Sequence, residues 1–141
     1  MILSVLCVKV AENKLLIGID IVEIERFEEV LRRRPNIVSK IFTTSEIAYC
    51  NKSKSPAKHF AVRFAAKEAF IKAFGRGMYK MPFKEIEVRN TEGGIPSIDF
   101  VARESRRIKF ADTVNVSSIN LSMSHSKSTA VAVVVVELKD K

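Results

Sequence analysis

Apolar and polar positions follow two different periods along the chain, and the two periods predict different elements. From Val22 to Arg34, apolar residues recur at every third or fourth position, which is the spacing of an amphipathic helix. Pro35 then ends this helix, because proline lacks the backbone N–H that a helix uses and disfavours the helical conformation of the residue before it. From Ile119 to Met123, apolar and polar residues alternate one by one, which is typical of a half-buried strand.

Short strand patterns recur elsewhere in the chain. They are expected at residues 15–19, at 83–89, around Ile98 and Phe100, and in the valine-rich run 129–138. Turns are predicted at Gly93-Gly94 and at His125-Ser126-Lys127, between consecutive strand patterns. Strands joined by turns indicate an antiparallel sheet with helices packed on it. The chain is therefore expected to be an α+β protein with one domain over residues 1–141.

The segment from Pro56 to Phe74 predicts the central helix of this domain. Ser55 followed by Pro56 is a typical helix start, and Gly75 is a typical stop. Apolar residues surround this helix on almost every side, which is usual for a helix in the middle of a domain. The helix nevertheless carries four charged residues, namely Arg63, Lys67, Glu68 and Lys72.

Glu68 is expected to lie among apolar neighbours, where an unpaired carboxylate costs several kcal/mol or becomes protonated. Two interpretations explain it equally well. In the first, Glu68 forms an ion pair with Lys72 one turn later, which is worth about 0.3–0.5 kcal/mol if exposed. In the second, Glu68 binds a metal ion while Arg63, Lys67 and Lys72 hold phosphates.

Asp20 is the second candidate carboxylate. Asp20-x-x-Glu23 matches a capping box, so a role as the N-cap of the following helix is the favoured interpretation of this residue alone. However, Asp20 also follows a buried strand, at a position where such folds present groups to ligands. A carboxylate from a strand end and one from a central helix suit Mg²⁺, which takes its remaining ligands from water and substrate phosphates.

Basic residues concentrate in one part of the chain. The formal net charge is +8, and residues 26–84 hold fourteen Lys and Arg against four Glu. Such a surface attracts a polyanion, although a solvated basic face without a partner is the alternative. Arg32-Arg33-Arg34 suggests a nucleic-acid-binding module as an alternative function. The absence of tryptophan and of any recognised nucleic-acid motif argues against this module.

The remaining patterns bear on location and on one further candidate residue. The run 129–138 is too short to span a membrane. Cys7 and Cys50 lack metal-ligand spacing and are expected to be reduced, as in a cytoplasmic protein. His125 is expected in an exposed turn, either as an ordinary surface histidine or as a phosphate contact or proton donor.

Three segments together resemble the holo-[acyl-carrier-protein] synthase family of phosphopantetheinyl transferases. They are Ile17–Arg26, Arg63–Gly75 and Leu121–His125 followed by the alanine–valine strand. Their order and spacing agree with the family over residues 17–137. Residues 1–14 precede this pattern, so they form an N-terminal extension whose role is open.

The resemblance implies a function and a set of site residues. Family members transfer the 4'-phosphopantetheine group of coenzyme A to a serine of an acidic acyl carrier protein, for fatty acid biosynthesis. The roles implied by position are Mg²⁺ ligation by Asp20 and Glu68, with Lys72 as a further catalytic residue; coenzyme A binding by Arg63, Lys72, Gly75 and His125; and carrier-protein docking by Arg26 and Arg33. The resemblance also implies a homotrimer.

Overall fold

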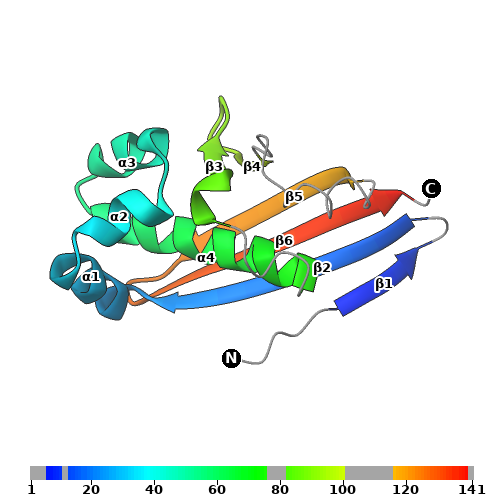
Figure 1. The fold of residues 1–141 in the computed structure, drawn as a ribbon, viewed down its shortest axis with the longest axis horizontal. Helices are drawn as coiled ribbons and strands as arrows, with labels where there is room; N and C mark the ends of the chain where they lie inside the picture. The colour runs from blue at the N-terminus through cyan, green and yellow to red at the C-terminus, as the bar shows by residue number, and fades with distance from the viewer. Residues whose placement is uncertain (1–5, 11–12, 76–81, 101–115, 140–141) are drawn as a thin grey trace.

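The structure, a computed structural model, describes residues 6–10, 13–75, 82–100 and 116–139 (Figure 1). The described strands form two sheets, one of four strands in the order β1-β2-β6-β5 and one of two strands, β3-β4. The strands are β1 (Leu6–Val10), β2 (Asn13–Glu23), β3 (Ile86–Asn90), β4 (Pro96–Phe100), β5 (Val116–His125) and β6 (Thr129–Lys139). The helices are α1 (Ile24–Arg33), α2 (Asn36–Ile41), α3 (Thr44–Asn51), α4 (Pro56–Phe74) and the short 3₁₀ helix η2 (Phe83–Glu85).

Every strand pairing in the larger sheet is antiparallel, as the turn pattern predicted. β2 and β6 pair along their whole lengths, from Asn13 opposite Lys139 to Glu23 opposite Thr129. β5 pairs with the other edge of β6, and residues 126–128 join the two strands, one residue later than the turn predicted at His125-Ser126-Lys127. The α+β class is therefore confirmed. The N-terminal extension, whose structure the sequence pattern left open, contains β1, and β1 pairs with β2 from Leu6 opposite Ile17 to Val10 opposite Asn13.

The central helix α4 begins and ends where the sequence predicted. It lies along one face of the larger sheet and contacts both β2 and β6 (Figure 1). Its alanines Ala65, Ala66 and Ala69 are completely buried. Their small side chains let the helix approach the sheet closely. The core that α4 forms with the sheet also includes Val134 and Val136 of β6. Within the described residues, no helix has the length and apolar character needed to cross a bilayer.

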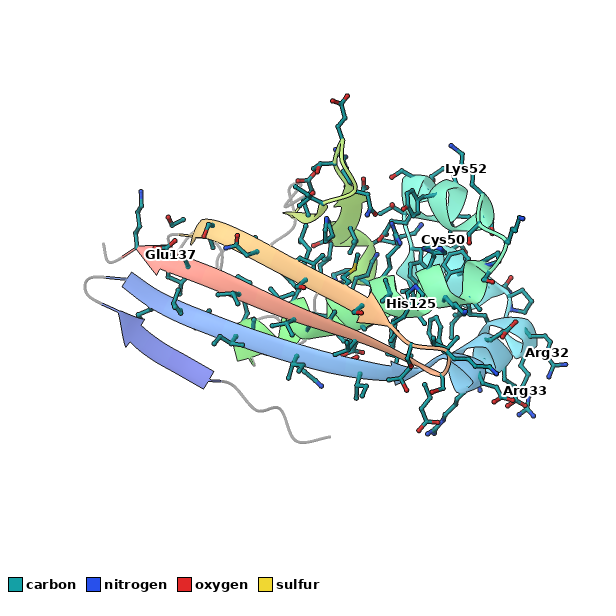
Figure 2. The ribbon with its side chains drawn as sticks, turned by 180° about the vertical axis from the view of Figure 1, so that it is seen from behind. Arg32, Arg33, Cys50, Lys52, His125 and Glu137 are labelled. Atoms are coloured by element: carbon teal, nitrogen blue, oxygen red, sulfur yellow. The ribbon has the colours of Figure 1, made fainter. Side chains whose placement is uncertain are left out.

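The opposite face of the larger sheet is not covered by any described helix (Figure 2). Residues of β6 alternate between buried positions, which face α4, and half-buried positions on this open face. Ile19 and Ile21 of β2 are 52% and 69% exposed there. Val133 stands opposite Ile19 in the β2–β6 register and continues the same apolar surface.

Helices α1, α2 and α3 gather at one end of the sheet, beside the N-terminal half of α4 (Figure 1). α1 starts at Ile24, two residues later than the periodicity indicated, because β2 continues to Glu23. Thr43-x-x-Glu46 matches a capping-box pattern in the sequence, and it caps α3, with Thr43 and Glu46 each accepting a hydrogen bond from the other's backbone amide. The sequence also predicts a short basic helix at residues 102–110, and this segment lies outside the described residues.

Candidate active site

Asp20 and Glu68 come from distant parts of the chain and line the same cavity. This cavity has a volume of about 500 Å³, and its other charged residues are Glu23 and Arg26. Its apolar part includes Phe27 of α1, together with Phe64 of α4. The fold therefore brings the two predicted carboxylates together beside an open space.

Glu68 is the carboxylate whose charge is least stabilised. No hydrogen bond to its side chain is found among the described residues. Burial raises the pKa of Glu68, the neighbouring Asp20 raises it further, and Lys72 opposes both effects. A second positive charge placed between the two carboxylates would relieve this unfavourable burial.

Lys72 pairs with Asp20 rather than with Glu68. Its Nζ atom lies 2.8 Å from Oδ1 of Asp20 and also donates to the backbone oxygen of Ile19. Both side chains are largely buried, at 14% exposed for Lys72 and 11% for Asp20. The interpretation of Glu68 as a simple partner of Lys72 is therefore not supported.

The favoured interpretation of Asp20 as a helix N-cap was wrong. Asp20 lies within β2, opposite Ala132 of β6, and α1 is preceded by Glu23 instead. The side chain of Glu23 makes no capping hydrogen bond. The backbone amide of Ile24 donates to Ser128, so the turn between β5 and β6 supplies a partner for the start of this helix.

The donor atoms of this cavity fit a hard divalent cation. Asp20 and Glu68 offer carboxylate oxygens, which Mg²⁺ prefers, and Mg²⁺ commonly uses one or two protein carboxylates. In the described part of the chain, no group of three or more His, Cys, Asp or Glu residues forms a closed metal site. A metal held here would thus keep positions open for a substrate.

Arg63 lies apart from the two carboxylates, in a second cavity of about 240 Å³. The side chain is buried, and its Nη2 atom donates to Oδ1 of Asn90 at 2.6 Å. Its guanidinium carbon lies 4.1 Å from the ring centre of Tyr49. Its Nε atom is buried and has no hydrogen-bond partner among the residues that the structure describes. Sequence reasoning missed Asn90, because nothing in the chain marks it as a partner 27 residues away.

His125 and Gly75 lie at separate places around α4. His125 is exposed at the end of β5, and its ring centre lies 6.3 Å from that of His59 on α4 (Figure 2). Gly75 follows the last residue of α4 with φ 68° and ψ −146°, a conformation that residues with a β-carbon rarely adopt. The coenzyme A roles of both residues stay predictions.

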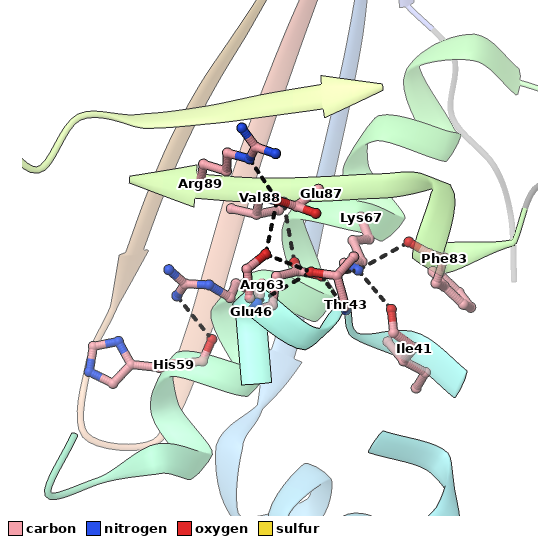
Figure 3. A network of polar contacts seen from close by, with 11 residues as sticks. Ile41, Thr43, Glu46, His59, Arg63, Lys67, Phe83, Glu87, Val88 and Arg89 are labelled. Atoms are coloured by element: carbon pink, nitrogen blue, oxygen red, sulfur yellow. Dashed lines mark hydrogen bonds and ion pairs between the residues drawn. The ribbon is translucent and has the colours of Figure 1, made fainter. Parts of the chain in front are cut away.

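Lys67 is a structural residue, contrary to the expectation that it holds phosphates. Its Nζ atom is completely buried and donates to Glu46, to the backbone oxygen of Ile41 and to that of Phe83 (Figure 3). These three bonds satisfy the three N–H donors of the ammonium group. No donor is left for a ligand.

Arg26 and Arg33 are both exposed on α1. Arg26 also lines the cavity of Asp20 and Glu68, so α1 connects this cavity with the outer surface. Arg33 lies near the end of the helix cluster and forms an ion pair with Glu29 at 2.6 Å (Figure 2). Because the side chain of Arg33 is 72% exposed, it remains accessible to a larger anionic partner.

Comparisons with known proteins agree with the resemblance found in the sequence. The family model of the 4'-phosphopantetheinyl transferase superfamily matches residues 16–134. The holo-[acyl-carrier-protein] synthase of Syntrophus aciditrophicus is 40% identical over 126 residues, which cover 87% of this chain and 96% of that protein.

Two similar solved structures carry the same name. The holo-(acyl-carrier-protein) synthase of Bacillus anthracis, in complex with CoA (3',5'-ADP), matches with a TM-score of 0.69 and 38% identity, over 86% of this chain and 94% of that one. The Helicobacter pylori holo-[acyl-carrier-protein] synthase, in complex with coenzyme A, matches with a TM-score of 0.68 and 31% identity, over 85% and 98%. This chain therefore belongs to the 4'-phosphopantetheinyl transferase superfamily and, within it, to the holo-[acyl-carrier-protein] synthases.

Proposed function

We propose that this chain transfers the 4'-phosphopantetheine group of coenzyme A to a serine of an apo-acyl carrier protein. The products are the holo-carrier protein and adenosine 3',5'-bisphosphate, and the reaction serves fatty acid biosynthesis. The observation that carries the proposal is the shared cavity of Asp20 and Glu68, inside the segment that the family model matches. This family membership favours the transferase over a nucleic-acid-binding module.

Asp20 and Glu68 are proposed to hold Mg²⁺. The ion would neutralise negative charge on the diphosphate of coenzyme A, which is the main requirement of phosphoryl transfer. The cavity, the two carboxylates and the unsatisfied charge of Glu68 support this assignment.

Lys72 and Glu68 are the proposed catalytic groups of the chain. Lys72 lies against Asp20 at 2.8 Å, so its positive charge can stabilise the phosphate that leaves with the nucleotide. Glu68 lines the cavity, and a carboxylate in this position can accept the proton of the attacking serine hydroxyl. Arg63, His125 and Gly75 are assigned to coenzyme A binding on the strength of the family pattern.

The carrier protein is proposed to dock on α1. Arg26 and Arg33 are exposed on this helix, and Arg26 also borders the cavity, so a docked protein could extend its serine toward Glu68. Positive charge on this surface would select an acidic carrier and speed its association.

A homotrimer is proposed as the working assembly. The open face of the larger sheet carries Ile19 and Ile21, and large apolar patches of this kind mark protein–protein interfaces. Light scattering would test this assembly, and a purely monomeric mass would contradict it. The cytoplasmic location predicted from the cysteines stays a prediction.

Intact-mass measurement of a carrier protein tests the proposed reaction. Apo-acyl carrier protein is incubated with this protein, coenzyme A and Mg²⁺. The expected result is a carrier whose mass has increased by one phosphopantetheine group, and no such increase when EDTA is present. An unmodified carrier in the complete mixture would contradict the proposal.

A further inference from the structure

Helices α3 and α4 and strand β3 are joined by a buried polar contact at Glu46. Its Oε1 atom accepts from Nζ of Lys67 at 2.6 Å and from the backbone amide of Thr43 at 2.9 Å. Its Oε2 atom accepts from the backbone amide of Val88 at 3.2 Å. One carboxylate therefore links three elements, and both charged side chains are at most 1% exposed (Figure 3).

The same three elements meet a second time at Arg63. Tyr49 of α3 lies against the guanidinium group, and Asn90 of β3 accepts a hydrogen bond from it. This second contact differs from the first because it borders the cavity of about 240 Å³. The first contact is closed, whereas the second is open to a ligand.

The spacing of the residues shows that the two contacts are stacked layers. Glu46 and Tyr49 are three residues apart on α3, and Arg63 and Lys67 are four apart on α4, so each pair lies on one helix face. On β3, Val88 contributes its backbone amide to the first contact, and Asn90, two residues later, contributes its side chain to the second. The closed layer consequently fixes the distance between the elements that carry the open one.

We propose that the Glu46–Lys67 ion pair is a positioning device for coenzyme A recognition. It holds Tyr49 and Asn90 at the separation that orients Arg63 toward an anionic group in the neighbouring cavity. The inference rests on the proposed function, because it takes Arg63 as a contact of coenzyme A. Glu46 and Lys67 themselves do not touch the substrate.

The burial of this pair supports a positioning role over a stabilising one. Apolar side chains of similar volume often stabilise a protein as well as a buried ion pair does, because both charges must lose their water. A buried ion pair does, however, require a specific geometry of each element that it joins. Arg63 contacts the same three elements, so its position depends on this geometry.

A double-mutant cycle between Glu46 and Arg63 tests the proposal. Glu46→Gln keeps the shape of the side chain, and its amide oxygen can still accept from the backbone amide of Thr43. It removes the negative charge that pairs with Lys67, and it replaces Oε2, the acceptor for the backbone amide of Val88, with a donating NH2 group. The kinetic constants and the Kd for coenzyme A are measured for wild type, Glu46→Gln, Arg63→Lys and the double variant. Thr43→Ala is the matched control, because it loosens the start of α3 without removing either charge.

The expected result is a KM and a Kd for coenzyme A raised about tenfold by Glu46→Gln, with kcat within about twofold of wild type. In the Arg63→Lys background, Glu46→Gln should raise the KM and the Kd for coenzyme A by less than about twofold, because the guanidinium group that the ion pair positions is already lost. Thr43→Ala should leave both constants near wild type.

Several results would overturn the proposal. They are an unchanged KM in Glu46→Gln, an equal increase in the Arg63→Lys background, or the same increase in Thr43→Ala. If Glu46→Gln does not melt cooperatively, Lys67→Met replaces it with the same expectations, and failure of both variants to fold assigns the pair to folding instead. Wild-type protein that does not bind coenzyme A would contradict the proposed function, whereas tight binding by both wild type and Glu46→Gln contradicts only the positioning role.

Discussion

Gly18 of β2 lies directly against the backbone of Ala69 in α4. A β-carbon at position 18 would come within 1.9 Å of the carbonyl oxygen of Ala69 and 2.7 Å of the amide nitrogen of Ala73. Glu68 and Lys72 each precede one of these alanines, and Asp20 lies two residues beyond Gly18 on the same strand face. The missing side chain of Gly18 therefore allows the helix and strand to approach until the proposed catalytic groups meet.

Gly18→Ala is expected to damage both stability and activity. The added methyl group would meet backbone atoms, so the whole helix must move, which typically costs about 1–3 kcal/mol or more. The same movement would separate Glu68 from Asp20 and lower kcat. Urea unfolding and the transfer assay measure the two effects, and a variant with wild-type stability and activity would show that the close approach is unimportant.

We expect His59 to make the folded protein less stable in mild acid. Burial lowers the pKa of His59 from 6.5, and Arg63, His125 and Lys58 lower it further. Since the folded pKa is below the unfolded one, the stabilisation is present above pH 6.5 and is lost as the pH falls through the folded pKa.

His59→Gln should therefore reduce the decrease in Tm between pH 7.5 and pH 5, and thermal unfolding at these two values measures the difference. Wild-type and variant Tm curves that run parallel over this range would contradict the assignment of the acid sensitivity to His59.

Cys50 should be chemically inert in the folded protein. It is completely buried, and desolvation raises the pKa of its thiol to about 11, so little reactive thiolate is present at neutral pH. Peptide mapping after iodoacetamide treatment at pH 8 should find Cys50 unmodified, and modified when urea is added. Rapid labelling of Cys50 under native conditions would contradict its burial.

Arg33→Glu should weaken the binding of the carrier protein and leave the binding of coenzyme A unchanged. Reversing an exposed charge on a docking surface mainly slows association, so KM for the carrier should rise about tenfold at low salt and less at high salt. Lys139→Glu makes the same charge change in β6, far from α1 along the chain, and serves as the control. Equal effects of both variants would assign the change to net charge and remove Arg33 from the docking surface.

The elements with local signals could be predicted from the sequence. Ser55-Pro56 and Gly75 delimit α4, and Thr43 with Glu46 caps α3, because these signals act between neighbouring residues. The prediction that Asp20 is a helix N-cap was wrong because a contact between distant segments overrides the local signal. Its capping pattern is local, but the pairing of β2 with β6 extends the strand beyond it and moves the helix start to Ile24.

Contacts between distant segments decided the rest of the site. The sequence pattern leaves Lys67 available for phosphates, but in the fold its partner Glu46, 21 residues earlier, lies beside it. Lys72 has Glu68 as its natural helical neighbour, yet it reaches across to Asp20 on the sheet. Periodicity identifies which faces of a helix are charged, but only the fold determines which charges meet.

Metal binding by Asp20 and Glu68 is the central claim of the proposed mechanism. Titration of Mn²⁺ in the presence of coenzyme A, followed by the electron paramagnetic resonance signal of the free ion, measures it directly. We expect one tightly bound ion per site in wild type and in Glu25→Gln, an exposed control on α1. Binding should weaken by more than about tenfold in Asp20→Asn and in Glu68→Gln. Unchanged Mn²⁺ affinity in either of these two variants would contradict the claim for that residue.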